Sequence, residues 1–275
     1  MTDCIFNPLW LDALHANASR PPSKPRQDLL LNGQRIGSVE PAVFKPIVLE
    51  GDSLRTPTFA LERVSGEHCW QITGNGTQAL SHIAQALREA NIGCVRAQWR
   101  DELLAVFNPE KQRVASVERG VARLLGIATH AVHLVGYTSS GSVWVQQRST
   151  DKAIDPGLWD TLVGGLVSIS DNLTTALARE TWEEAGIELH QVQQLHAGGR
   201  VMVRHPNALD GGIGYVEEHI DWFAGVIPEG LHPANQDGEV AQFALLEPLE
   251  LKSQLESHAF TLDASLILSR LLTGP

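Results

Sequence analysis

Three carboxylates lie close together in the second half of the chain, at Glu180, Glu183 and Glu184. The surrounding pattern predicts a helix over about residues 171–185, and Gly186 is the residue type that ends one. Glu180 and Glu184 would stack one turn apart, where like charges destabilise a helix by about 0.2–0.5 kcal/mol. Glu183 and Glu184 would lie in the last turn, where the helix dipole disfavours anions. Carboxylates placed against both effects indicate that a cation binds there.

The same helix face changes from apolar to acidic along its length. At about 100° per residue, Leu173 and Leu177 fall on one side with Glu180 and Glu184, so the glutamates continue the stripe that faces the core. A solvated acidic helix end is the plain alternative for two glutamates before a glycine. Partly buried carboxylates, however, need a cation, and oxygen ligands in this number suit Mg²⁺ or Mn²⁺. The sequence therefore predicts a divalent-metal site.

Alternating apolar and polar segments around this helix predict the sheet that positions it. A glycine-rich turn precedes the helix, and the segments on either side have the length and composition of strands. The expected elements are a strand hairpin over 130–138 and 142–149, further strands at 199–205 and 214–227, and amphipathic helices at 247–257 and 262–272.

The N-terminal part predicts a smaller mixed α/β domain. Its expected elements are a helix begun by Asn7 and Pro8, a loop over 20–28, a hairpin turn at Asn32-Gly33, a helix over 77–93, one or two strands in 94–107 and a helix over 116–126 capped by Ser116. We therefore divide the chain into an accessory domain over 1–122 and a second domain over 123–275.

The spacing from Gly165 to Ile187 resembles the Nudix box, G-x5-E-x7-R-E-U-x-E-E-x-G-U, in which U is a bulky aliphatic residue. The chain reads Gly165, five residues, Asp171, seven residues and then R-E-T-W-E-E-A-G-I from Arg179. Two positions depart from the pattern, because Asp171 replaces a glutamate and Thr181 replaces an aliphatic residue. The glutamate of the pattern braces the box arginine. The shorter Asp171 leaves two alternatives open, a brace to Arg179 or an N-cap of the helix.

This resemblance implies an α/β (α+β) fold in which a Nudix α/β/α sandwich with a mixed sheet follows the smaller domain. It implies that Glu180, Glu183 and Glu184 ligate the metal together with the Gly164 carbonyl, and that Arg179 orients Glu180. The implied reaction is attack of metal-activated water on a diphosphate, a chemistry for which Mg²⁺ supplies charge neutralisation and a lowered pKa of water. The catalytic base is left open between a box glutamate and Glu239, on a later loop.

Segments outside the box resemble one branch of the Nudix superfamily, in which a domain of unknown function precedes the Nudix module. They are residues 99–107, 117–137, 148–165 and 236–246. Eukaryotic relatives in this branch are described as thiamine-pyrophosphokinase-related. The resemblance implies hydrolysis of thiamine diphosphate, or of a damaged analogue, to the monophosphate.

Three alternative functions stand beside this one. In the first, the substrate is a nucleotide-type diphosphate. In the second, the module binds a ligand and regulates without catalysis. An isopentenyl-diphosphate-isomerase-like enzyme, which resembles Nudix proteins but uses a cysteine in its catalytic module, is disfavoured because no cysteine follows residue 94.

Four further side chains are candidates for substrate binding. Arg148 and Lys152 flank the glycine-rich turn and could hold the diphosphate, with ordinary surface cations as the alternative. Trp159 and Tyr215 could stack on an aromatic ring, with core packing as the alternative. The histidines form no H-x3-H or H-E-x2-H pair, and no phosphate-binding P-loop occurs, so neither a zinc site nor a P-loop enzyme is predicted.

Composition limits the partners. The chain has 21 Lys and Arg against 32 Asp and Glu, a net charge of −11. Duplex nucleic acid and anionic membranes select basic surfaces, so we expect neither as a partner. A small-molecule organic diphosphate fits if a metal or a local group of cations neutralises it.

The remaining sequence features concern disulfides, targeting segments and membrane spans. Cys4, Cys69 and Cys94 are odd in number and widely spaced, which predicts neither a disulfide framework nor a metal knuckle. No basic leader precedes an apolar segment, and no apolar run approaches about 18 residues. We expect a soluble, cytoplasmic protein whose N-terminal domain closes over the substrate or supports a homodimer.

Overall fold

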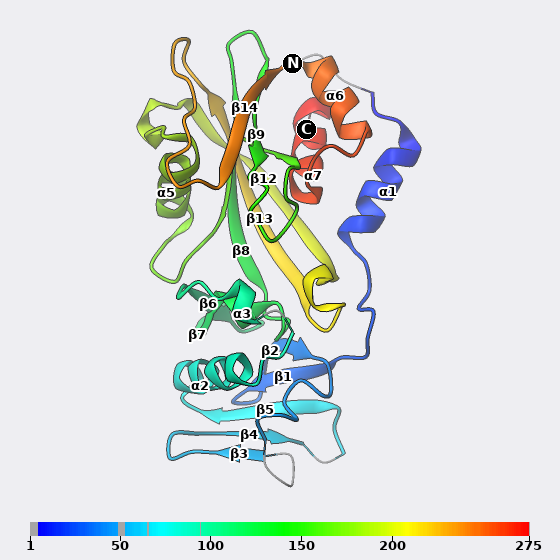
Figure 1. Ribbon diagram of the computed structural model, residues 1–275, viewed down its shortest axis with the longest axis vertical. Helices are drawn as coiled ribbons and strands as arrows, with labels where there is room; N and C mark the ends of the chain where they lie inside the picture. Colours follow the sequence, from blue (N-terminus) through cyan, green and yellow to red (C-terminus); the bar gives the residue numbers. More distant parts are fainter. Residues whose placement is uncertain (1–4, 49–52, 65, 94, 275) are drawn as a thin grey trace.

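The computed structural model describes residues 5–48, 53–64, 66–93 and 95–274, and it shows two units stacked along the long axis of the molecule (Figure 1). Both units combine helices with mixed sheets, so the predicted α/β fold class is confirmed. No helix in the described ranges is long and apolar enough to cross a membrane. Cys69 is buried and free, whereas Cys4 and Cys94 lie outside the described residues.

A seven-stranded mixed sheet organises the C-terminal unit. Its main path runs β10-β9-β8-β13-β12, with β11 paired to β8 and β14 paired to β9, and only the β8–β13 pair is parallel. The strands are β8 (Thr129–Tyr137), β9 (Val143–Arg148), β10 (Trp159–Asp160), β11 (Val163–Leu166), β12 (Gln193–Pro206), β13 (Tyr215–Val226) and β14 (Val240–Leu246). The predicted hairpin and the two later strands are present, and β10, β11 and β14 are additional to the prediction.

Helices cover both faces of this sheet (Figure 1). On one face, α5 (Leu173–Ala185) packs on β8 and β11, where its Ala176 and Leu177 share a core cluster with Val132 and Leu134 of β8. On the other face, α7 (Leu262–Thr273) packs on β12 and on α6 (Pro248–Glu256). The C-terminal unit is therefore an α/β/α sandwich, with the acidic end of α5 close to β11.

The first helix belongs by packing to the C-terminal unit. Asn7 accepts a hydrogen bond from the Leu9 amide, and Pro8 follows as the first residue of α1 (Pro8–Ala18), as predicted. Trp10 and Leu14 of α1 are buried in the same cluster as residues of α7, and α1 also contacts β12. The chain then crosses to the other unit (Figure 1).

A five-stranded sheet forms the N-terminal unit, in the order β2-β1-β5-β4-β3. Asn32 and Gly33 turn β1 into β2 with φ angles of 48° and 85°, the left-handed pair that a tight hairpin requires. Helix α2 packs on β4 and β5 through apolar residues that include Leu80 and Ile83. The elements are β1 (Gln27–Leu31), β2 (Gln34–Val39), β3 (Ser53–Arg55), β4 (Phe59–Arg63), β5 (Cys69–Gly74) and α2 (Gly76–Glu89).

Two helical turns and a hairpin connect the two units. They comprise α3 (Val95–Gln98), β6 (Leu103–Phe107), β7 (Arg113–Glu118) and α4 (Arg119–Ala122). The predicted helix over 116–126 with Ser116 as its cap is wrong, because Ser116 lies inside β7. Pairing of β7 with β6 buries Val117 opposite Leu104, and this long-range pairing overrides the local helical pattern. Helix α4 begins after Glu118, whose side chain accepts a hydrogen bond from the Gly120 amide.

Candidate active site

The helix that carries the three glutamates is capped at both ends. Asn172 accepts hydrogen bonds from the Thr174 and Thr175 amides, and Thr175 Oγ1 accepts from the Asn172 amide, which forms a capping box. Gly186 ends the helix in the left-handed conformation, with φ 62°, as predicted. The alternative role of Asp171 as the N-cap is wrong, because its neighbour Asn172 occupies that position.

Asp171 instead braces the box arginine. Arg179 Nε and Nη2 donate to Asp171 Oδ2 at 3.1 and 2.9 Å. Burial alone would raise the pKa of Asp171, but the hydrogen bonds from Arg179 and Ser168 outweigh it and hold that pKa below its usual range. The shorter carboxylate therefore still reaches the arginine in this chain.

Arg179 also gathers two of the three glutamates. Its Nη1 donates to Glu180 Oε1 at 2.8 Å and to Glu183 Oε2 at 3.0 Å, while Nη2 donates to the Leu166 carbonyl at 3.2 Å. One guanidinium thus joins the helix to the end of β11 and holds two carboxylates at a common point. Arg179 thus lies where it can orient Glu180, and its orienting role stays a prediction.

Glu180 packs directly on the backbone of a glycine. A Cβ built on Gly165 would lie 2.0 Å from Glu180 Cδ, so a side chain at position 165 would displace the carboxylate. Burial raises the pKa of Glu180 to about 7, although Arg179 opposes the shift. A nearby cation would favour the ionised form of this carboxylate.

Glu184 is the most enclosed of the three, with 1% of its surface exposed. Its Oε2 accepts from the Gly164 amide and from Gln146 Nε2, both at 2.8 Å, and Lys152 Nζ lies 3.6 Å from Oε1. Burial raises the pKa of Glu184 to about 8, against the charge of Lys152 and the hydrogen bond from Gly164. Glu184 therefore ties α5 to β9 and β11 in this structure, and its role as a metal ligand stays a prediction.

The donor set fits a hard divalent cation. No three Asp, Glu, His or Cys side chains in the described part of the chain converge closely enough to hold a metal together. Glu180 and Glu183 nevertheless meet at the same Arg179 nitrogen, and Gly164 and Gly165 line the same hollow. Mg²⁺ in enzymes is held by one or two carboxylates, with water and phosphate oxygens completing its shell. Two adjacent carboxylates facing a hollow are thus sufficient protein ligands.

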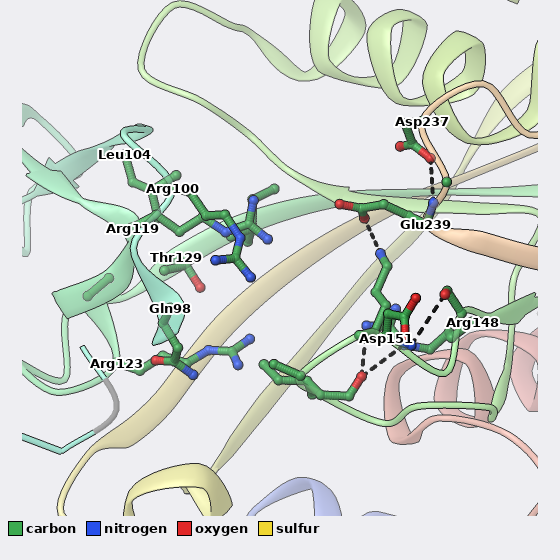
Figure 2. Close-up of a pocket in the computed structure, with 17 residues that line it drawn as sticks. Gln98, Arg100, Leu104, Arg119, Arg123, Thr129, Arg148, Asp151, Asp237 and Glu239 are labelled. Atoms are coloured by element: carbon green, nitrogen blue, oxygen red, sulfur yellow. Dashed lines mark hydrogen bonds and ion pairs between the residues drawn. The ribbon is translucent and has the colours of Figure 1, made fainter. Parts of the chain in front are cut away.

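Two adjoining hollows form the cleft in front of these carboxylates. One of ≈ 270 Å³ contains Glu180 and Glu183, and the other, of ≈ 250 Å³, is shown in Figure 2. Both are lined by Arg148, Lys152 and Glu239, so they are continuous. The structure therefore brings these three predicted site residues to the same cleft as Glu180 and Glu183, whereas Glu184 lines neither hollow.

The cations and the loop acid in this cleft are tied to one another. Arg148 Nη1 lies 3.4 Å from Asp160 Oδ2, and its Nη2 donates to the Ile154 carbonyl at 3.0 Å. Lys152 forms an ion pair with Glu239 (Figure 2). Burial would raise the pKa of Glu239, but Lys152 outweighs it and lowers that pKa. Glu239 is therefore ionised at neutral pH, and its role as the base stays a prediction.

The two predicted aromatic residues lie elsewhere. Trp159 packs against the core cluster of α1 and α7, and Tyr215 donates its hydroxyl to the Arg20 carbonyl at 2.8 Å. Neither lines the two hollows. Trp159 thus follows the alternative of core packing, whereas Tyr215 is held by a hydrogen bond to a distant segment, and the structure gives no support to substrate stacking by either.

Reasoning from the sequence missed three arginines of the cleft, Arg100, Arg119 and Arg123, and one buried amide, Gln146. The spacing of Arg119 and Arg123, one helical turn apart, was the available signal for two of them. Gln146 was visible only as a polar residue in an apolar strand. All four reach the site through packing between segments that are distant in sequence.

A family model and several known proteins are similar to this chain. A family model described as "NUDIX domain" matches residues 128–266, just over half of the chain. An uncharacterized protein of Saccharomyces cerevisiae is 27% identical over 62% of this chain and 53% of its own length. Nudix hydrolase 24, chloroplastic, of Arabidopsis thaliana is 28% identical over 68% of this chain and 51% of its own length. The crystal structure of DR0079 from Deinococcus radiodurans covers 62% of this chain and 98% of its own, at 19% identity and a TM-score of 0.48.

The class defined by the fold and the matched residues follows directly. An α/β/α sandwich with glutamates at the end of a helix after a glycine-rich strand is the framework described above, and the family model covers it from β8 to the start of α7. The chain belongs to the NUDIX domain family. It spans about half the length of the curated relatives it matches.

Proposed function

We propose that the protein is a Mg²⁺-dependent pyrophosphohydrolase that cleaves the diphosphate of a small organic molecule. The observation that carries this proposal is the placement of Glu180 and Glu183 around Arg179, at the mouth of a hollow whose other walls carry Arg148 and Lys152. A hollow lined by both carboxylates and cations suits a metal-bound diphosphate. Membership of the NUDIX domain family supports the same reaction.

Each side chain has a defined task in this proposal. Glu180, Glu183 and Glu184, with the Gly164 carbonyl, hold the metal, and Arg179 keeps Glu180 and Glu183 aimed at one point. When bound, Mg²⁺ supplies charge neutralisation, polarisation of phosphorus and a lowered pKa of water. Arg148 and Lys152 bind phosphate oxygens. A box glutamate or Glu239 takes the proton of the attacking water, and single glutamine variants of each separate these two.

The substrate that we place first is thiamine diphosphate or a damaged analogue, hydrolysed to the monophosphate. Support for it comes from the likeness of residues 99–107, 117–137 and 236–246 to the thiamine-pyrophosphokinase-related branch. Nucleotide-type diphosphates come second. The non-enzymatic alternative is a binding or regulatory module without catalysis. Metal-dependent turnover distinguishes the two hydrolase proposals from this module.

The organisation of the whole protein is part of the proposal. The boundary at residues 122–123 stays a prediction. Buried residues as far as Ile127 pack in the N-terminal core, while α1 packs in the C-terminal core. The homodimer and the cytoplasmic location also stay predictions.

Phosphate release with a panel of diphosphates tests the proposal. The panel contains thiamine diphosphate, its oxidised analogues, nucleoside diphosphate sugars, dinucleoside polyphosphates and nucleoside triphosphates, each with and without Mg²⁺. Glu180→Gln is the inactive reference, and Glu229→Gln, at an exposed glutamate outside the cleft, is the matched control. Glu180-dependent release from the thiamine compounds supports both the reaction and the thiamine substrate. Release from other compounds alone discards the thiamine assignment. No release from any compound favours the binding module.

A further inference from the structure

Three arginines outside the family model line the cleft opposite the Nudix loops. Figure 2 shows Arg100, Arg119 and Arg123 on one wall, facing Arg148 on the other. The three come from the segment that connects the two units, before the matched residues begin at 128. Five of the 17 residues lining this hollow are Arg or Lys and three are Asp or Glu, although the chain as a whole has a net charge of −11. Such a local excess of cations marks a place where an anion binds.

The charges of these arginines are only partly compensated. Arg100 Nη1 donates to the Ala97 and Trp99 carbonyls at 3.0 Å, and no ion pair between described residues includes it. Arg123 lies 3.9 Å from Glu218, whose same oxygen also accepts from Thr129. A guanidinium with only carbonyl or distant carboxylate partners retains donors for an incoming anion.

Arg119 is the better paired member of the group. Its Nη1 lies 2.7 Å from Glu102 Oε2, and 41% of its side chain is exposed. An exposed pair of this kind contributes about 0–1 kcal/mol, so it does not prevent the arginine from exchanging partners.

One buried carboxylate fixes the geometry of this wall. Glu118 Oε1 accepts from the Arg100 amide at 3.0 Å and from the Gly120 amide at 3.3 Å, so it joins the two segments that carry the arginines. A Cβ on Gly120 would lie 3.1 Å from the backbone of Gln98 and Trp99, which shows that these segments pack closely. The wall is therefore preorganised for binding.

We propose that Arg100, Arg119 and Arg123 bind the phosphate oxygens of the substrate, so that the segment connecting the two units completes the active site. This inference rests on the proposed function. The ligand class is a multiply charged phosphate anion, because the planar guanidinium pairs with phosphate through two parallel hydrogen bonds. The diphosphate then lies between the glutamates of α5 on one side and the arginines of the connecting segment on the other. The catalytic module alone lacks half of this anion site.

Binding of inorganic pyrophosphate to the full chain in EDTA tests the site without turnover. Calorimetry compares the unmodified protein with Arg100→Gln and Arg123→Gln. It is done at low ionic strength, because salt then screens the charges least. Loss of a charge-assisted hydrogen-bond pair predicts at least about tenfold weaker binding for each variant. Arg100 is exposed, so its substitution leaves the fold intact. Arg35→Gln, which removes only a surface pair with Asp28, is the control and binds as the unmodified protein does.

Steady-state kinetics then separates the two proposals. With a diphosphate that the protein hydrolyses, Arg123→Gln raises KM at least about tenfold with a smaller change in kcat, and Arg123→Lys restores part of the loss. Equal pyrophosphate binding by both arginine variants and the unmodified protein, with hydrolysis intact, overturns the arginine site and leaves the proposed function standing. Arginine-dependent pyrophosphate binding by a protein that hydrolyses no diphosphate overturns the proposed function and keeps the anion site.

Discussion

Glu184→Gln removes a buried ionisable carboxyl group while leaving its hydrogen bonds in place. Oε2 of Glu184 accepts from Gly164 and Gln146, both at 2.8 Å, and the carbonyl of a glutamine can accept the same two bonds. Lys152 loses a partner at 3.6 Å but keeps its ion pair with Glu239. The metal-free variant should therefore be more stable than the unmodified protein.

The pKa of Glu184 sets the size of the effect. The unfolded chain ionises this carboxyl near 4.5 and the folded chain only near about 8, because the site is buried. The folded state thus holds its proton more tightly, and that contribution to stability is fully present below about pH 4.5 and is lost as the pH rises towards about 8. At about 1.4 kcal/mol per pH unit, the unmodified protein loses roughly 3 kcal/mol by pH 7, whereas Glu184→Gln does not.

Thermal unfolding in EDTA across this pH range is the assay. We expect Glu184→Gln to melt at least about 5 °C above the unmodified protein near pH 7 to 8, and the difference to vanish near pH 4.5. Turnover with Mg²⁺ should fall by at least about a hundredfold. A variant that melts below the unmodified protein at pH 8, or that shows the same difference at every pH, refutes the reasoning about this buried charge.

Three further substitutions test separate parts of the site. Gly165→Ala places a Cβ against Glu180 Cδ, so turnover should fall by at least about a hundredfold; wild-type turnover would show that the carboxylate need not lie there. Asp171→Asn weakens the brace to Arg179, and we expect a tenfold or greater loss of turnover per folded molecule, with an unchanged rate counting against the brace. Asn172→Ala removes the N-cap of α5 and should lower the free energy of unfolding by about 1 kcal/mol in urea titration, which an unchanged midpoint would contradict.

Local patterns predicted the helix that carries the three glutamates. The apolar stripe through Leu177 and the stop at Gly186 are encoded within one segment, and both are present in the structure. The choice between Asp171 and Asn172 as the cap was not decidable locally, because both residue types cap helices well. Asn172 is the N-cap, because the carboxylate of Asp171 accepts hydrogen bonds from Arg179, a contact made across a turn.

Features that depend on distant segments escaped prediction. Ser116 lies in a strand because β6 pairs with β7, and Tyr215 lies outside the cleft because its hydroxyl bonds to Arg20 near the other end of the chain. The arginine wall likewise forms only when the connecting segment packs against the Nudix loops. The spacing of residues along the sequence does not indicate these contacts between distant segments.

The dependence of hydrolysis on both Mg²⁺ and Glu180 tests the central claim most directly. The measurement is phosphate release from the best diphosphate of the panel during a Mg²⁺ titration, with the unmodified protein, Glu180→Gln and Glu229→Gln in parallel. We predict saturable activation by Mg²⁺ for the unmodified protein and Glu229→Gln, and at least about a hundredfold lower turnover for Glu180→Gln at every Mg²⁺ concentration. Equal turnover by Glu180→Gln, or full activity in EDTA, would contradict the assignment of this site as a metal-dependent pyrophosphohydrolase.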